Sequence, residues 1–218
     1  MSMVQRGVRA GATQEREVAV GVRGWLRRRR AVRVTLSVAA LLLLASFPLS
    51  YWSLRLEAPQ YPGGLPFTMH VTRLGGNVQE IDELNHYIGM KKLEDVATLE
   101  RRLWPAGLVA VALLALVPAV VDGRWTWIFA LGPLLYPVGF VVDLYWRLYT
   151  TGHSLDPHAA LSSSVHAFTP RLLGSGMIAQ FRTEAAFGPG YYFALVAAAL
   201  VAVAFWLDSR SFARGRRA

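Results

Sequence analysis

Four stretches of the chain consist almost wholly of apolar residues and are separated by polar segments. They cover about residues 34–52, 104–121, 125–146 and 191–207. Each holds roughly 17 to 22 residues, which is enough for a helix to cross about 30 Å of hydrocarbon. Tyrosine and tryptophan stand near their ends, as is typical of spanning helices. The pattern predicts four transmembrane helices.

Composition and charge agree with a membrane protein. The chain has 218 residues, of which 54% are hydrophobic, and a formal net charge of +9. Its arginines cluster beside the apolar stretches, chiefly at 27–33 and 210–217. That placement indicates topology and argues against nucleic acid as a partner, because positive residues flank spans on the cytoplasmic side. We therefore expect a multi-pass protein of the bacterial inner membrane, with the lipid bilayer as its partner and both termini cytoplasmic.

This topology predicts the organisation of the whole chain. Residues 1–30 are expected to be a disordered basic cytoplasmic tail, 31–208 a four-helix membrane domain, and 209–218 a second basic tail. Two outer loops, 53–103 and 147–190, lie outside the cytoplasm. Each is too short to bury a core alone, so we expect the two to form one small capping unit. The predicted fold class is an all-α membrane protein whose first outer loop holds a short strand and a short helix.

The first outer loop carries the local signals for that strand and helix. Apolar and polar residues alternate over 65–73, which predicts a strand between the turn signals YPGG and LGGN. Asn77 followed by Glu80 resembles a capping box, and Gly89 suits a helix end. A helix over about 78–89 would place Ile81, Leu84 and Ile88 on one face.

Candidate metal ligands lie in the same loop. The chain has no cysteine, so a metal site would have to use histidine, methionine, carboxylate or backbone groups. His86 and Met90 stand four residues apart, with Glu83 and His70 as further candidates. Imidazole and thioether suit copper, so the pattern is consistent with a copper site. The alternative is a solvated face at Glu83 and His86, with Met90 in ordinary packing.

The second outer loop adds further histidines. His153 and His158 flank SLDP, which contains Asp156, so a cluster of His, Asp and His is one hypothesis. The other is a turn made by Asp156 and Pro157, with both histidines in solvent. A site of two ligands would be weak and unselective, and His153 is our first choice for a third. His166 has no partner at a useful spacing.

No catalytic pattern stands out along the chain. SSS at 162–164 is not a nucleophile elbow, and GSG at 174–176 lacks the strand-to-helix context of a phosphate loop. The spans carry few charges, and Asp143 with Arg147 is most simply an ion pair one turn apart. We therefore do not expect an enzyme.

Several segments resemble a family of small bacterial membrane proteins. They are LEAPQYPGGL (56–65), EIDELNHYIGM (80–90), GHSLDPHAAL (152–161) and FTPRLLGSGMIAQF (168–181). We associate that family with gene clusters for periplasmic copper enzymes, nitrous oxide reductase in particular. The resemblance implies an accessory role in copper delivery, maturation or electron supply, with a periplasmic copper enzyme or cytochrome as partner. His86, Met90 and His153 lie in the matching motifs.

Two other functions stay open at this stage. The first is a metal-free membrane scaffold or a subunit of an electron-transfer complex, in which the motifs serve packing and hydrogen bonding. The second is a membrane enzyme that acts on lipid or envelope substrate, which the lack of a paired catalytic signature disfavours.

Overall fold

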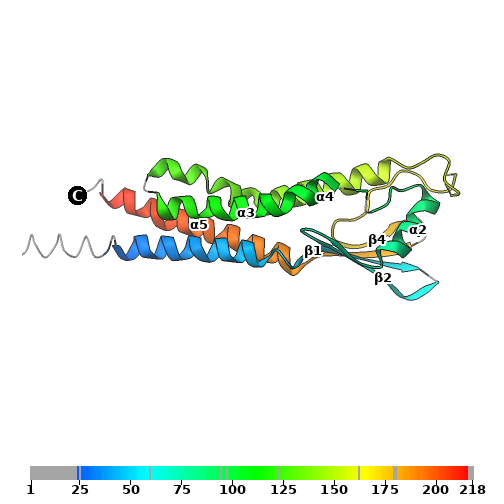
Figure 1. Cartoon of the computed structure of the whole chain (residues 1–218), viewed down its shortest axis with the longest axis horizontal. Coiled ribbons are helices and arrows are strands. Elements are labelled where there is room, and N and C mark those ends of the chain that lie inside the picture. The colour runs from blue at the N-terminus through cyan, green and yellow to red at the C-terminus, as the bar shows by residue number, and fades with distance from the viewer. Residues whose placement is uncertain are drawn as a thin grey trace, which may run out of the picture.

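The computed structural model describes residues 24, 26–58, 60–93, 95–96, 98–121, 123–161, 163–178 and 181–215. Helices are bundled at one end of the elongated molecule, and an antiparallel sheet lies at the other (Figure 1). In order, the elements are a first helix over 26–45, β1 (Ser50–Ala58), β2 (Tyr61–His70), β3 (Leu74–Gly76), α2 (Val78–Ile88), α3 (Thr98–Val120), the 3-10 helix η1 (Arg124–Ile128), α4 (Leu131–His153), β4 (Gly174–Ile178), β5 (Phe181–Phe187) and α5 (Pro189–Gly215).

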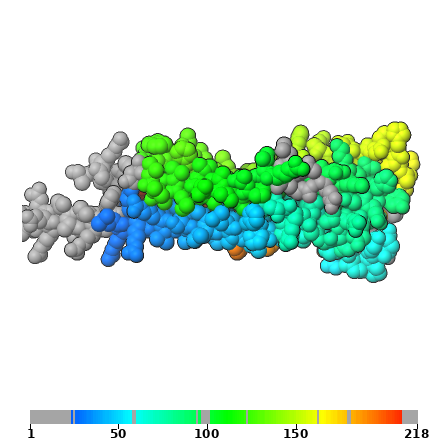
Figure 2. Space-filling model, in the orientation of Figure 1, coloured from blue at the N-terminus to red at the C-terminus, as the bar shows by residue number. Residues whose placement is uncertain are grey.

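Three helical segments of the described chain are long and apolar enough to cross a membrane. They are Arg102–Val120, Arg124–His153 and Pro189–Ser209. They contain the third and fourth predicted spans and cover the second, 104–121, up to residue 120. The first helix lies beside α3 along the bundle (Figure 2).

The predicted first span, 34–52, differs from the structure at its end. The helix stops at residue 45, and Ser50 already belongs to β1. Pro48 explains the stop, because proline has no N–H to donate and disfavours a helical conformation at the residue before it. At the other end, residues 26–30 are helical, although they were expected in the disordered tail. The rest of that tail lies outside the described residues, apart from residue 24.

The expected all-α fold class is wrong, because the two outer loops form a five-stranded sheet. All neighbouring strands are antiparallel, in the order β3-β2-β1-β5-β4. Strands β1 to β3 come from the first half of the chain and β4 and β5 from the second. In the centre, Leu54 pairs with Phe67 on one side and with Ala185 on the other. The two loops therefore lie together as one unit, because a continuous ladder of backbone hydrogen bonds between strands joins them.

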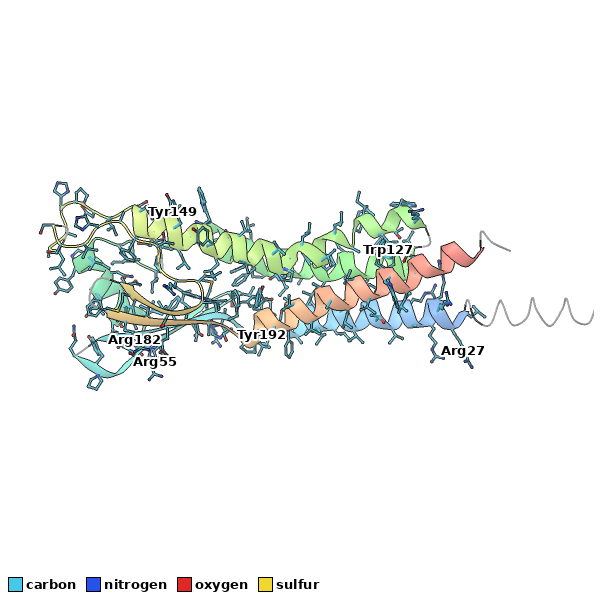
Figure 3. The ribbon with its side chains drawn as sticks, turned by 180° about the vertical axis from the view of Figure 1, so that it is seen from behind. Arg27, Arg55, Trp127, Tyr149, Arg182 and Tyr192 are labelled. Atoms are coloured by element: carbon cyan, nitrogen blue, oxygen red, sulfur yellow. The ribbon has the colours of Figure 1, made fainter. Side chains whose placement is uncertain are left out.

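Alternating residues explain why these segments form strands. In β5, Phe181, Thr183 and Ala185 are buried, whereas the residues between them are exposed. Successive side chains of a strand point to opposite faces, so one face of the sheet is apolar and the other polar. Arg55 and Arg182 lie on the polar face, on the side of the sheet opposite Tyr149 of α4 (Figure 3).

The helix predicted in the first loop is confirmed as α2. Gly89 ends it in the left-handed conformation, with φ of 80°. The capping box is only partly present: Asn77 Nδ2 donates to Glu80 Oε1 at 3.0 Å, and no side chain caps the helix backbone. The strand predicted over 65–73 lies earlier in the chain, since β2 includes YPGG and ends at His70, and the supposed turn LGG is β3.

Candidate ligand-binding cavity

A cavity of about 120 Å³ lies between the apolar face of the sheet, α2, and the ends of α3 and α4 nearest the sheet. The sheet contributes Trp52, Leu54, Leu56, Phe67, Met69 and Phe181. Helices α3 and α4 contribute Trp104, Asp143, Leu144, Arg147, Leu148 and Thr151. Because most of these side chains are apolar, the cavity favours an apolar occupant.

Helix α2 closes the cavity on one side. Its apolar residues Ile81, Leu84 and Ile88 line the wall, and Ile81 and Ile88 are almost fully buried. The spacing of three and four residues had placed them on one face of the helix. Asn85 shares this face because it follows Ile81 by four residues.

Few polar side chains reach the cavity. Asn85 lines it and is 6% exposed, and its Nδ2 has no hydrogen-bond partner among the residues that the structure describes. On α4, Arg147 Nε lies 3.7 Å from Asp143 Oδ1, one helical turn away. A buried amide without a partner costs free energy, so Asn85 is the group on this wall that gains most from a polar ligand atom.

Met90 lies on the cavity side of the chain, away from its expected place beside His86. Gly89 turns the backbone after α2, and the Met90 N–H donates to the Asn85 carbonyl at 2.8 Å. Met90 therefore lines the cavity, whereas His86 is exposed and lines an open hollow with Glu83 and Lys92. The two predicted copper ligands face different surroundings.

Backbone hydrogen bonds join α2 to the loop after α4. Asp156 N–H donates to the Gly89 carbonyl at 2.8 Å, and Leu161 N–H donates to the Tyr87 carbonyl at 3.0 Å. We call this contact the clasp. A Cβ on Gly89 would lie 2.8 Å from Asp156 O and 3.1 Å from Ala159 Cβ, so the clasp requires glycine there. The segments LNHYIGM and GHSLDPH are thus in direct contact.

One candidate histidine, His158, lies beside a carboxylate at the clasp. His158 Nδ1 lies 3.3 Å from Asp156 Oδ1, and both side chains are exposed. The His158 N–H, which donates to the same oxygen at 2.9 Å, is the main cause that holds the pKa of Asp156 below its ordinary value. Burial, the second-largest cause, opposes this shift, and the His158 ring and then the charges of His158 and His86 lower the pKa further.

The other histidines have separate surroundings. His153 stacks on Tyr149 with ring centroids 4.0 Å apart, and its Nδ1 lies 2.8 Å from the Tyr149 carbonyl oxygen. His70 ends β2, where burial and then the charge of Arg73 lower its pKa. His166 is exposed. Within the described ranges, no three His, Asp or Glu side chains form a group that could hold a metal ion. The copper site stays a prediction.

Sequence reasoning identified the apolar face of α2 but missed the cavity. Asp143 and Arg147 do form the expected ion pair, yet nothing in their spacing relates them to Asn85 or to Trp52. The available signal was the alternation in SLRLE and FRTEAAF, which is typical of strands with one buried face. A sheet with an apolar face near an apolar helix would have pointed to an enclosed space between them.

The comparisons with known proteins add no relative. The chain matches no protein-family model, and no curated protein matches it.

Proposed function

We propose that this chain is a membrane-anchored binding protein that holds part of an apolar ligand in the cavity between its sheet and its helices. The observation that carries the proposal is the cavity itself, with its apolar walls and the Asn85 amide, whose Nδ2 has no hydrogen-bond partner among the described residues. The proposal is a more specific form of one hypothesis from the sequence, that of a metal-free membrane scaffold or a subunit of an electron-transfer complex. The proposal places the sheet outside the cytoplasm, on a multi-pass protein of the bacterial inner membrane.

The position of the cavity supports a ligand that comes from the bilayer. Trp104 lies near the start of the Arg102–Val120 segment, and Asp143 to Thr151 lie near the end of Arg124–His153. These are the ends of two candidate spans that face the sheet. A cavity at this level borders the lipid surface, so an apolar molecule reaches it without crossing much water.

The size of the cavity limits what part of a ligand it encloses. An apolar cavity of about 150 Å³ is large enough to bind benzene. The cavity here, at about 120 Å³, suits a single small ring or a short length of alkyl chain. The remainder of a longer ligand would extend toward the lipid.

Photolabelling in lipid nanodiscs tests the proposal. A phenyl diazirine probe should label α2, which lies outside the three candidate spans, as well as the lipid-facing helices. Leu84→Phe should remove the label on α2 because it fills the cavity. Leu173→Phe is the matched control, since Leu173 is exposed and outside the cavity lining. Labelling of α2 that Leu84→Phe leaves unchanged would contradict the proposal.

Thiol labelling tests the topology. The chain has no native cysteine, so single cysteines report cleanly. We expect Ser154→Cys to react with an impermeant reagent in intact spheroplasts and Ser209→Cys to react only after lysis, because both positions are exposed. The reverse pattern would put the sheet in the cytoplasm and overturn the stated orientation.

A copper-accessory role is the second candidate. The feature that favours it is the clasp, where His158 Nδ1 lies 3.3 Å from Asp156 Oδ1. The charge of His86 also lowers the pKa of Asp156, as the smallest of its causes. Imidazole and carboxylate suit Cu(II), and a periplasmic copper enzyme or cytochrome would be the partner. Copper titration of the purified protein should lose stoichiometry in His86→Ala but keep it in His166→Ala. Equal binding by both variants would leave only the cavity function.

A further inference from the structure

The chemistry of the cavity wall restricts its ligand beyond being apolar. Asn85 is 6% exposed and lines the cavity, yet its Nδ2 has no hydrogen-bond partner in the described part of the chain. Buried polar groups in folded proteins are almost always hydrogen-bonded. A donor left unsatisfied in an apolar wall is a place where a ligand acceptor atom gains affinity.

The part of the wall that α4 forms disfavours a charged ligand. Asp143 and Arg147 both line the cavity and pair with each other at 3.7 Å, so the wall carries one charge of each sign. A carboxylate or phosphate in the cavity would be desolvated and would compete for a side chain that already has a partner. An uncharged ligand keeps the pair intact.

We infer that the cavity takes an uncharged membrane-soluble molecule with a carbonyl oxygen, which accepts a hydrogen bond from the Asn85 amide. This inference rests on the proposed function, because it names the ligand class of the same cavity. Two bilayer sources carry this chemistry: a quinone, whose ring bears the carbonyl, and an acyl ester. Both present an apolar body with an acceptor atom and no charge.

Competition against the phenyl diazirine label on α2 tests the inference. The competitors are a decyl-substituted benzoquinone, methyl decanoate and decylbenzene, the last of which has no carbonyl. We expect at least one carbonyl compound to compete at a concentration about 10-fold below that of decylbenzene, the effect of one hydrogen bond. The better carbonyl competitor identifies the source.

Asn85→Leu is the decisive variant, because it keeps the shape of the side chain and removes the amide. We expect the 10-fold preference to disappear while decylbenzene competes as well as before or better. The unliganded variant should be no less thermostable, since replacing an unsatisfied buried amide by an apolar group removes a cost. Asn85→Met serves if the leucine variant does not accumulate.

The outcomes separate the two proposals. Equal competition by all three compounds, or a carbonyl preference that survives in Asn85→Leu, overturns the inference and leaves the proposed function standing. If the label on α2 is insensitive both to Leu84→Phe and to every competitor, the proposed function itself fails.

Discussion

Gly89 is the position where a single added methyl group should open the clasp. Its φ of 80° lies in the left-handed region, which costs an L-residue about 1–2 kcal/mol. The new Cβ would also lie 2.8 Å and 2.9 Å from backbone atoms of Asp156, which cannot rotate away as a side chain can. Overpacking of this kind costs about 1–3 kcal/mol. Gly89→Ala should therefore destabilise the closed clasp by about 2–5 kcal/mol.

Two other glycines separate the backbone strain from the overpacking in this destabilisation. Gly174 has a φ of 79° but open space around a Cβ, so Gly174→Ala carries the backbone strain alone. Gly139 lies in α4 with open space and no left-handed φ, so Gly139→Ala should be neutral or stabilising by up to about 1 kcal/mol. All three variants add the same methyl group.

Hydrogen exchange measured by mass spectrometry provides the assay. The amides of Asp156 and Leu161 are bonded across the clasp, so peptides that contain them report its opening. Gly89→Ala should raise their exchange at least about 30-fold, whereas Gly174→Ala and Gly139→Ala should leave it near that of the unaltered protein. The reasoning is refuted if Gly89→Ala exchanges no faster than Gly174→Ala at these amides.

Two further predictions concern the links between the loops. Trp52→Phe should lower the free energy of unfolding by about 1–3 kcal/mol, because the Nε1 of the buried Trp52 donates to the Leu172 carbonyl of the second loop at 2.8 Å. Thermal denaturation measures the effect, and Trp125→Phe, at an exposed ring, is the control. His158→Ala should raise the pKa of Asp156 part of the way to its ordinary value, as measured by carboxyl ¹³C NMR. An unchanged pKa would show that neither the His158 ring nor its charge causes the lowering. The folded chain favours the carboxylate of Asp156, so its stabilising effect is complete above the ordinary aspartate pKa and is lost as pH falls through the lowered one.

Local patterns predicted the elements that depend on neighbouring residues. The helix α2 and its glycine end follow from a period of 3.6 and a left-handed cap, both of which are encoded within about a dozen residues. The long apolar helices likewise follow from composition. These features need no knowledge of distant segments.

The sheet could not be predicted in the same way, because its central pairing joins distant residues. Trp52 pairs with Phe187, and no single-sequence pattern identifies such a partner. Tyr51 and Trp52 show the consequence: at the end of the apolar stretch 34–52 they look like aromatic residues at a membrane surface, yet they are 1% and 2% exposed. An aromatic residue at the end of an apolar run has the same appearance in either case.

The cavity was out of reach for a related reason. Asn85 could be placed on the apolar face of α2 from its spacing, and Asp143 with Arg147 could be placed on one helix. That these groups line the same space depends on the sheet, on α2 and on two helices that meet only in the folded chain. Spacing along a sequence does not encode such an enclosure.

The strand order has a mechanical consequence. The first helix leads into β1, and β5 leads into α5 through Gly188, whose N–H donates to the Tyr51 carbonyl at 2.9 Å. The first helix and α5 are therefore joined directly to the neighbouring strands β1 and β5, so a displacement of these helices should be passed on to the sheet. Trp104 of α3 and the lining residues of α4 between 143 and 151 contribute to the cavity from the helix ends nearest the sheet. Lateral pressure that moves the ends of α3 and α4 relative to the sheet would narrow or widen the cavity. The thickness and tension of the bilayer should therefore change how firmly the proposed apolar ligand is held.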